Sequence, residues 1–114
     1  MSTTTAIAAP QINAAGALLA LLAAHPTLPT PEVDLRELRA PGTGIAWGLR
    51  IALHDGLDHF EQWRAALLLD PAAVDHKQSR DGALAWLVVV GSAYGVPIEL
   101  VGFYDLPDPD DENE

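Results

Sequence analysis

Cysteine is absent from this chain of 114 residues. The absence excludes a disulfide scaffold, a cysteine-based zinc site and a thiol nucleophile, and it fits a reducing compartment. Basic residues are also scarce, because six lysines and arginines stand against sixteen aspartates and glutamates. The six bases are scattered along the chain, whereas a nucleic-acid-binding protein gathers its bases into a patch. We therefore expect no direct binding of DNA or RNA.

The sequence also lacks a long uninterrupted apolar run. Its most apolar stretch, Gly82–Tyr104, is broken by two glycines, a proline and a glutamate between residues 91 and 99. A membrane-spanning helix needs about 20 consecutive apolar residues. The first five residues carry no lysine or arginine, so the Ala- and Leu-rich segment Ala14–Ala24 is not typical of a secretory signal. We expect no membrane association and a cytoplasmic location.

Acidic residues are concentrated at the end of the sequence. The last ten residues hold six acids and no base, and removing them leaves ten acids against six bases, a net charge of −4 instead of −10. Acidic segments that contain proline are usually disordered. We predict a disordered segment over residues 1–9, one domain over residues 10–105 and a disordered acidic tail over residues 106–114. A minor alternative is a DNA mimic, a protein whose acidic side chains imitate phosphates. The acids are clustered in a tail that is expected to be disordered and not on a rigid face, which argues against it.

Three segments have the pattern of β-strands. The apolar runs Ala83–Val90 and Val96–Tyr104 are rich in β-forming residues and flank the turn-prone segment Gly91–Gly95, which predicts a hairpin. Ile45–Leu53 alternates large apolar residues with small or polar ones and predicts a third strand. The pattern in Glu32–Leu38 is weaker, and it predicts an edge strand or an irregular segment.

Helices are predicted over Pro10–Ala24 and Leu57–Leu69. In the first, four apolar residues recur at helical spacing and predict the face that is turned to the core: Ile12, Ala15, Leu19 and Leu22. The polar segment Val74–Asp81 is compatible with the start of a further strand. The order α-(β)-β-α-β-β predicts an α+β fold, with a small antiparallel sheet of three to four strands and two helices.

Both faces of the predicted strand Ala83–Val90 are apolar. One face carries Ala83, Ala85, Leu87 and Val89, and the other carries Leu84, Trp86, Val88 and Val90. One helix layer covers only one face of a small sheet, so the other face must contact something. We predict that Ala83, Ala85, Leu87 and Val89 form an interaction face, for a second copy in a homodimer or for another protein. The chain is then a non-catalytic interaction or regulatory accessory protein. The competing interpretation places one helix on each face and gives a buried monomer.

The sharpest chemical cluster is His54-Asp55-Gly56-Leu57-Asp58-His59. Histidine and carboxylate together can bind a divalent metal or transfer protons, so His54, Asp55, Asp58 and His59 are weak candidates for a metal site or a small hydrolase. However, the two histidines are five residues apart, whereas ligands on one helix face are three or four apart. The favoured interpretation is a connection from a strand to a helix, with no catalytic residue, no metal and no cofactor.

Several features resemble those of a family of small acidic proteins from high-GC actinobacteria, their phages and their integrative elements. These features are the Leu-rich first helix that ends in His25-Pro26, the helix Leu57–Leu69 with Trp63, and the segment Gly95-Val96-Pro97-Ile98-Glu99. The resemblance spans roughly Gly16–Tyr104. It implies an actinobacterial host and no established activity, because the matching residues are structural and not catalytic.

Overall fold

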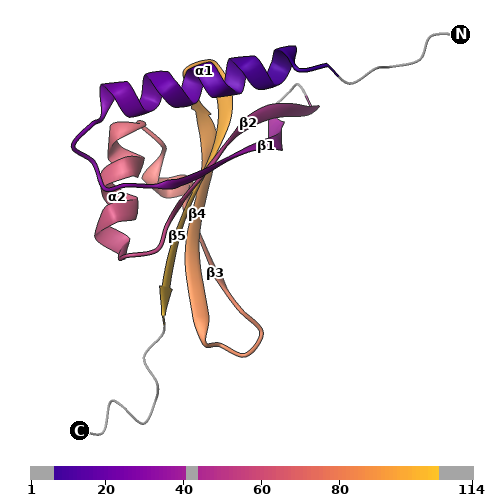
Figure 1. Ribbon diagram of the computed structural model, residues 1–114. Helices are drawn as coiled ribbons and strands as arrows, with labels where there is room; N and C mark the ends of the chain where they lie inside the picture. Colours follow the sequence, from indigo (N-terminus) through magenta and orange to yellow (C-terminus); the bar gives the residue numbers. More distant parts are fainter. Residues whose placement is uncertain (1–6, 41–43, 106–114) are drawn as a thin grey trace, which may run out of the picture.

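The computed structural model describes residues 7–40 and 44–105 (Figure 1). The elements in chain order are α1 (Ala9–Ala24), β1 (Glu32–Ala40), β2 (Gly44–Leu53), α2 (Leu57–Ala66), the short 3₁₀ helix η1 (Pro71–Ala73), β3 (Asp75–Gln78), β4 (Leu84–Ala93) and β5 (Val96–Asp105). The predicted acidic tail and most of the predicted N-terminal segment lie outside the described residues. None of the described helices is long and apolar enough to cross a membrane.

The five strands form one sheet in the order β1-β2-β5-β4-β3. The α+β class is confirmed, but the expected three to four strands and the purely antiparallel arrangement are wrong. The sheet is mixed, because β2 pairs with β5 in parallel while the other three pairings are antiparallel. The two edge strands, β1 and β3, come from the segments whose sequences have the weakest alternation of apolar and polar residues. In β3 all side chains are exposed, and in β1 exposed side chains mostly alternate with partly buried ones.

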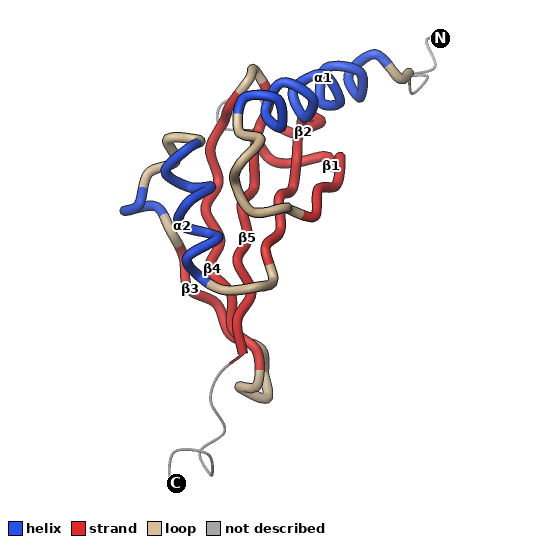
Figure 2. The backbone as a smooth tube through the Cα atoms, turned by 60° about the vertical axis from the view of Figure 1, so that its left-hand side comes forward, coloured by secondary structure: helices blue, strands red, loops and turns tan. Residues whose placement is uncertain are grey.

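Both helices pack against the same face of the sheet (Figure 1 and Figure 2). In α2, Phe60 and Trp63 are buried, and Phe60 lies so close to Gly102 of β5 that a Cβ there would come within 2.7 Å of it. The covered face has the alternate residues of the three central strands at its centre: Leu49, Ile51 and Leu53 of β2, Val89 of β4, and Ile98 and Leu100 of β5. The core is therefore a single layer between the helices and the sheet.

The first helix presents a different face to the sheet from the one predicted. Its buried residues are Ala14, Ala17 and Leu21. Ile12 and Leu19, predicted to be buried, are 66% and 72% exposed. The helix is apolar around most of its circumference, so hydrophobic spacing does not identify the inner face. Small side chains on the inner face allow the helix to approach the sheet closely.

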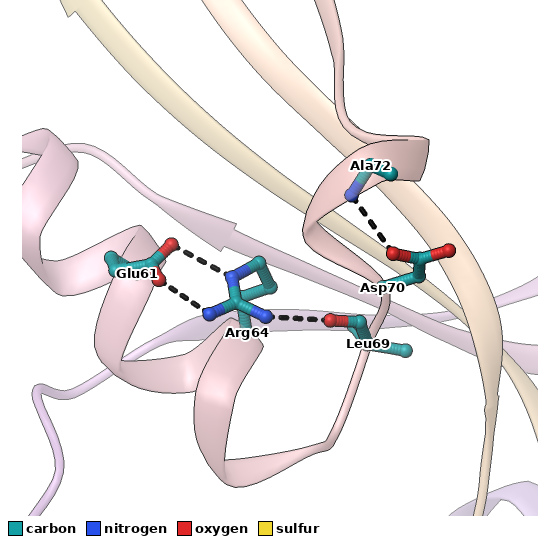
Figure 3. Close-up of polar contacts among 5 residues, drawn as sticks. All are labelled: Glu61, Arg64, Leu69, Asp70 and Ala72. Atoms are coloured by element: carbon teal, nitrogen blue, oxygen red, sulfur yellow. Dashed lines mark hydrogen bonds and ion pairs between the residues drawn. The ribbon is translucent and has the colours of Figure 1, made fainter.

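The second helix begins at the predicted residue but ends three residues early, at Ala66. Leu68 follows with a φ of 59°, a left-handed backbone conformation that stops the helix. The Arg64 guanidinium donates a hydrogen bond to the carbonyl oxygen of Leu69 at 2.7 Å and pairs with Glu61 (Figure 3). This pairing lowers the pKa of the Glu61 carboxyl below its ordinary value of 4.5. One arginine thus connects the last turn of α2 to the segment that leads into η1.

Candidate interaction face

The predicted interaction face is part of the hydrophobic core. Ala85 and Val89 are 0% and 1% exposed, and Leu87 packs against the core cluster under the helices. The assignment of Ala85, Leu87 and Val89 to a free surface is therefore wrong, whereas Ala83 is exposed but lies outside the strand. One helix layer does leave one face of β4 uncovered. However, the helices cover the face of Ala85, Leu87 and Val89, and the face of Leu84, Trp86, Val88 and Val90 is the uncovered one.

Among residues 7–40 and 44–105, no helix covers the side of the sheet opposite α1 and α2, which we call the uncovered face. Its apolar side chains come from four strands: Leu38 of β1, Ala52 of β2, Leu84, Trp86, Val88 and Val90 of β4, and Pro97, Val101 and Phe103 of β5. Ala52 and Val101 are buried by their neighbours in the sheet, Val90 is 60% exposed, and the others are partly buried. A sheet face left in water normally carries polar residues, so this composition indicates a surface that binds something.

Aromatic and charged side chains form a cluster on this face around Phe103. The Phe103 ring lies 6.1 Å from Trp86 and stacks on His54, with 5.0 Å between ring centroids. The Arg50 guanidinium lies 5.8 Å from the Phe103 centroid, a cation–π geometry, and forms an ion pair of 3.2 Å with Glu99. The Arg50–Glu99 pair is only about a quarter exposed on each side. Arg50 and Glu99 therefore neutralise each other on this face.

A groove opens on the uncovered face where the parallel pairing of β2 and β5 ends. The ladder stops at the pair Leu49–Ile98, next to Pro97, which has no N–H to donate. The space beside Pro97 has a volume of about 370 Å³. It is lined by Leu38, Arg39, Val90, Gly91, Pro97, Ile98 and Glu99. Gly48 allows this arrangement, because a Cβ there would lie 2.2 Å from the Pro97 carbonyl oxygen.

The four weak metal candidates do not come together. His54 is the first residue after β2, where it stacks on Phe103 and lies 3.8 Å from a Glu32 carboxylate oxygen. Asp58 is in the first turn of α2, and Asp55 is exposed in the connection. Within residues 7–40 and 44–105, no three histidine or acidic side chains are placed to share a metal ion.

Sequence reasoning missed Arg50, Glu99 and Phe103 as members of one surface. Alternation along each strand assigns each of them to a face, but only the pairing of β2 with β5 places Arg50 opposite Glu99. That pairing joins strands 49 residues apart in the chain. The sequence feature that pointed to this surface is that both faces of β4 are apolar. It predicts that one face is not covered by a helix, but it does not identify that face.

Comparisons with protein-family models, with curated protein sequences and with solved structures gave no match to this chain.

Proposed function

We propose that this chain is a non-catalytic protein–protein interaction protein, of an accessory or regulatory kind, that docks through the uncovered face of its sheet. The observation that carries the proposal is the row Leu84, Trp86, Val88 and Val90, which lies on the side without a helix layer. Leaving a large apolar side chain in water forgoes roughly 1.5–3 kcal/mol relative to full burial. A contact that covers this row recovers much of that free energy.

The size of the face is suited to a stable contact. β4 and β5 have 10 residues each, and at about 3.3 Å per residue they are roughly 33 Å long. Strands about 4.8 Å apart make the sheet roughly 19 Å wide. The resulting area is of the same order as the ~800 Å² that each partner contributes to a standard interface.

The charges on the face favour a second copy of the chain as its occupant. The chain has a net charge of −10, so two copies repel each other over most of their surfaces. On the uncovered face, however, Arg50 pairs with Glu99, and the other charged side chains are of both signs: Arg36 and Lys77 against Glu32, Asp34 and Asp75. Because both signs are present, a two-fold rotation can bring a positive side chain of one copy against a negative side chain of the other, as a self-complementary isologous contact requires. Two sheets packed in this way lie about 10 Å apart.

The setting of this activity is proposed on sequence grounds alone. The resemblance of the helix Leu57–Leu69 and the segment Gly95–Glu99 supports an origin in an actinobacterium or its mobile elements. The absence of cysteine supports a cytoplasmic location. Metal binding or hydrolysis at His54–His59 is not proposed, because these side chains do not converge.

The test is the oligomeric state of a charge-bearing variant of the face. Val90→Glu places a charge on the uncovered face at a side chain that is already 60% exposed. The new carboxylate lies opposite Glu99 of β5 and weakens that strand pairing, so a circular dichroism melt first establishes that the variant is folded. Leu68→Glu is the matched control, because Leu68 is 90% exposed and lies outside the sheet. By sedimentation equilibrium, we expect the wild type and Leu68→Glu to associate and Val90→Glu to have a lower average mass. The proposal fails if all three have the same mass, or if the wild type is monomeric up to ~1 mM, where even an association of about −4 kcal/mol is detectable.

A further inference from the structure

The strand β1 is a long open edge of the sheet (Figure 2). It has nine residues and, within the described part of the chain, pairs only with β2. Its outer side therefore presents a row of backbone N–H and C=O groups. Such an edge serves as a template for another strand unless it is short or covered. The opposite edge strand, β3, has only four residues.

The charged residues of β1 are arranged to complement themselves. Asp34 and Arg36 lie on the same face of the strand, and both are exposed. Neither belongs to an ion pair among the described residues. We propose that β1 pairs antiparallel with β1 of a second copy, in the register that places Leu35 opposite itself. This contact uses the edge of the sheet, so it goes beyond the proposed face contact and does not depend on it.

A two-fold axis restricts the possible registers. The residue on the axis faces its own copy, and residues at equal distances on either side of the axis pair with each other. Asp34, Arg36 or Glu37 on the axis faces its own charge. Leu35 on the axis instead places Asp34 opposite Arg36 of the second copy, and symmetry forms this pair twice. Opposite charges across two strands stabilise the pairing, and like charges destabilise it.

Two other apolar centres give poorer pairings. With Val33 on the axis, the acids Glu32 and Asp34 oppose each other. With Leu38 on the axis, the strands overlap only over residues 36–40 of β1, whereas the Leu35 register overlaps over residues 32–38. The Leu35 register therefore combines the longer overlap with complementary charges.

The edge contact and the face contact are geometrically compatible. The edge pairing extends the sheet across a two-fold axis perpendicular to it and leaves the helices of both copies on one side. The uncovered faces then form one wider apolar surface. The axis of a face-to-face contact lies parallel to the sheet, at a right angle to the first. Where the two axes meet, the contacts close into a tetramer and not an open fibre.

The experiment uses charge reversal in the Val90→Glu background, so that loss of the face contact and loss of the edge contact are separated. We expect the Val90→Glu protein to form a dimer in sedimentation velocity at low salt. Adding Asp34→Arg or Arg36→Asp turns both symmetric pairs into like charges, and dimerisation weakens by at least roughly tenfold. An equimolar mixture of the two single reversals restores the dimer, because each chain then carries the charge that the other lacks. Glu37→Arg is the control for Asp34→Arg, because it changes the net charge by the same amount. Residue 37 opposes Val33 in this register, so Glu37→Arg leaves the dimer intact.

Each result supports or overturns the edge pairing. Restoration in the mixture supports it, and a misfolded single variant does not form that mixed dimer. The inference is overturned if the Val90→Glu protein is monomeric at every concentration. It is also overturned if the single reversals dimerise as well as their parent, or if Glu37→Arg disrupts the dimer as strongly as they do. A face contact without an edge contact gives a wild-type dimer and a monomeric Val90→Glu protein.

Discussion

Two adjacent valines in β4 report directly on which face of the sheet is buried. Val89 points to the helices and is 1% exposed, whereas Val90 points to the uncovered face and is 60% exposed. We expect Val89→Ala to lower the free energy of unfolding far more than Val90→Ala does. The two variants make the same chemical change at neighbouring positions of one strand. Their difference therefore isolates burial from the intrinsic preference of valine for strands.

The expected magnitude follows from the groups removed. Burial is worth about 0.8 kcal/mol per methylene, and the surrounding core relaxes only partly around the space left behind, so Val89→Ala costs roughly 1.5–3 kcal/mol. Val90→Ala loses mainly strand propensity, which costs less than about 1 kcal/mol. For a domain of this size, 1 kcal/mol lowers the melting temperature by roughly 3–6 °C.

Urea denaturation followed by tryptophan fluorescence measures both variants, because Trp63 is buried in the same core. The protein is kept at a low concentration, so that association through the uncovered face does not contribute. Equal losses at the two positions, or a greater loss at Val90, would refute the assignment of the faces.

Three further substitutions test local packing and charge. A Cβ at Gly16 of α1 meets no atom within 4 Å. Gly16→Ala therefore raises the free energy of unfolding by roughly 0.5–1 kcal/mol, because glycine weakens a helix interior. A thermal melt that shows destabilisation contradicts this expectation. Gly102→Ala brings a methyl group within 2.7 Å of Phe60. This overpacking lowers the free energy of unfolding by roughly 1–3 kcal/mol. An unchanged denaturation midpoint contradicts the close approach of α2 to β5. Glu61→Gln lowers the melting temperature slightly at pH 7, because the wild-type carboxylate pairs with Arg64 and its folded pKa lies below 4.5. The stabilisation by Glu61 is present above its unfolded pKa and is lost as the pH falls through its folded pKa. The difference in melting temperature between wild type and variant therefore disappears in acid. A difference that grows in acid contradicts the lowered pKa of Glu61.

Local patterns in the sequence predicted most elements but not their arrangement. The alternation in Ile45–Leu53 and the turn at Gly91–Gly95 predicted β2 and the β4–β5 hairpin, because side-chain period and turn chemistry act over a few residues. The parallel pairing of β2 with β5 depends on α2, β3 and β4 folding between them. No local signal encodes such a pairing, and this explains why the sheet was expected to be smaller and antiparallel.

The identity of the uncovered face could not be predicted from local sequence patterns either. The two apolar faces of β4 revealed that one face needs a partner, but the helices were free to cover either. The choice depends on residues distant in sequence: Gly102 of β5 admits Phe60, and Gly91 admits Leu69, both on the face of Val89. In α1, likewise, Leu19 and Leu21 are equally apolar, and only packing decides that Leu21 is buried.

The chain has no cysteine, so a single introduced thiol reports on the uncovered face without background reaction. In Val90→Cys, the rate of alkylation by iodoacetamide is measured as the protein concentration is raised, with Leu68→Cys as a control that is exposed away from the sheet. Docking of a second copy on the uncovered face predicts that the Val90→Cys rate falls with concentration while the Leu68→Cys rate stays constant. A Val90→Cys rate that is independent of concentration contradicts self-association through this face.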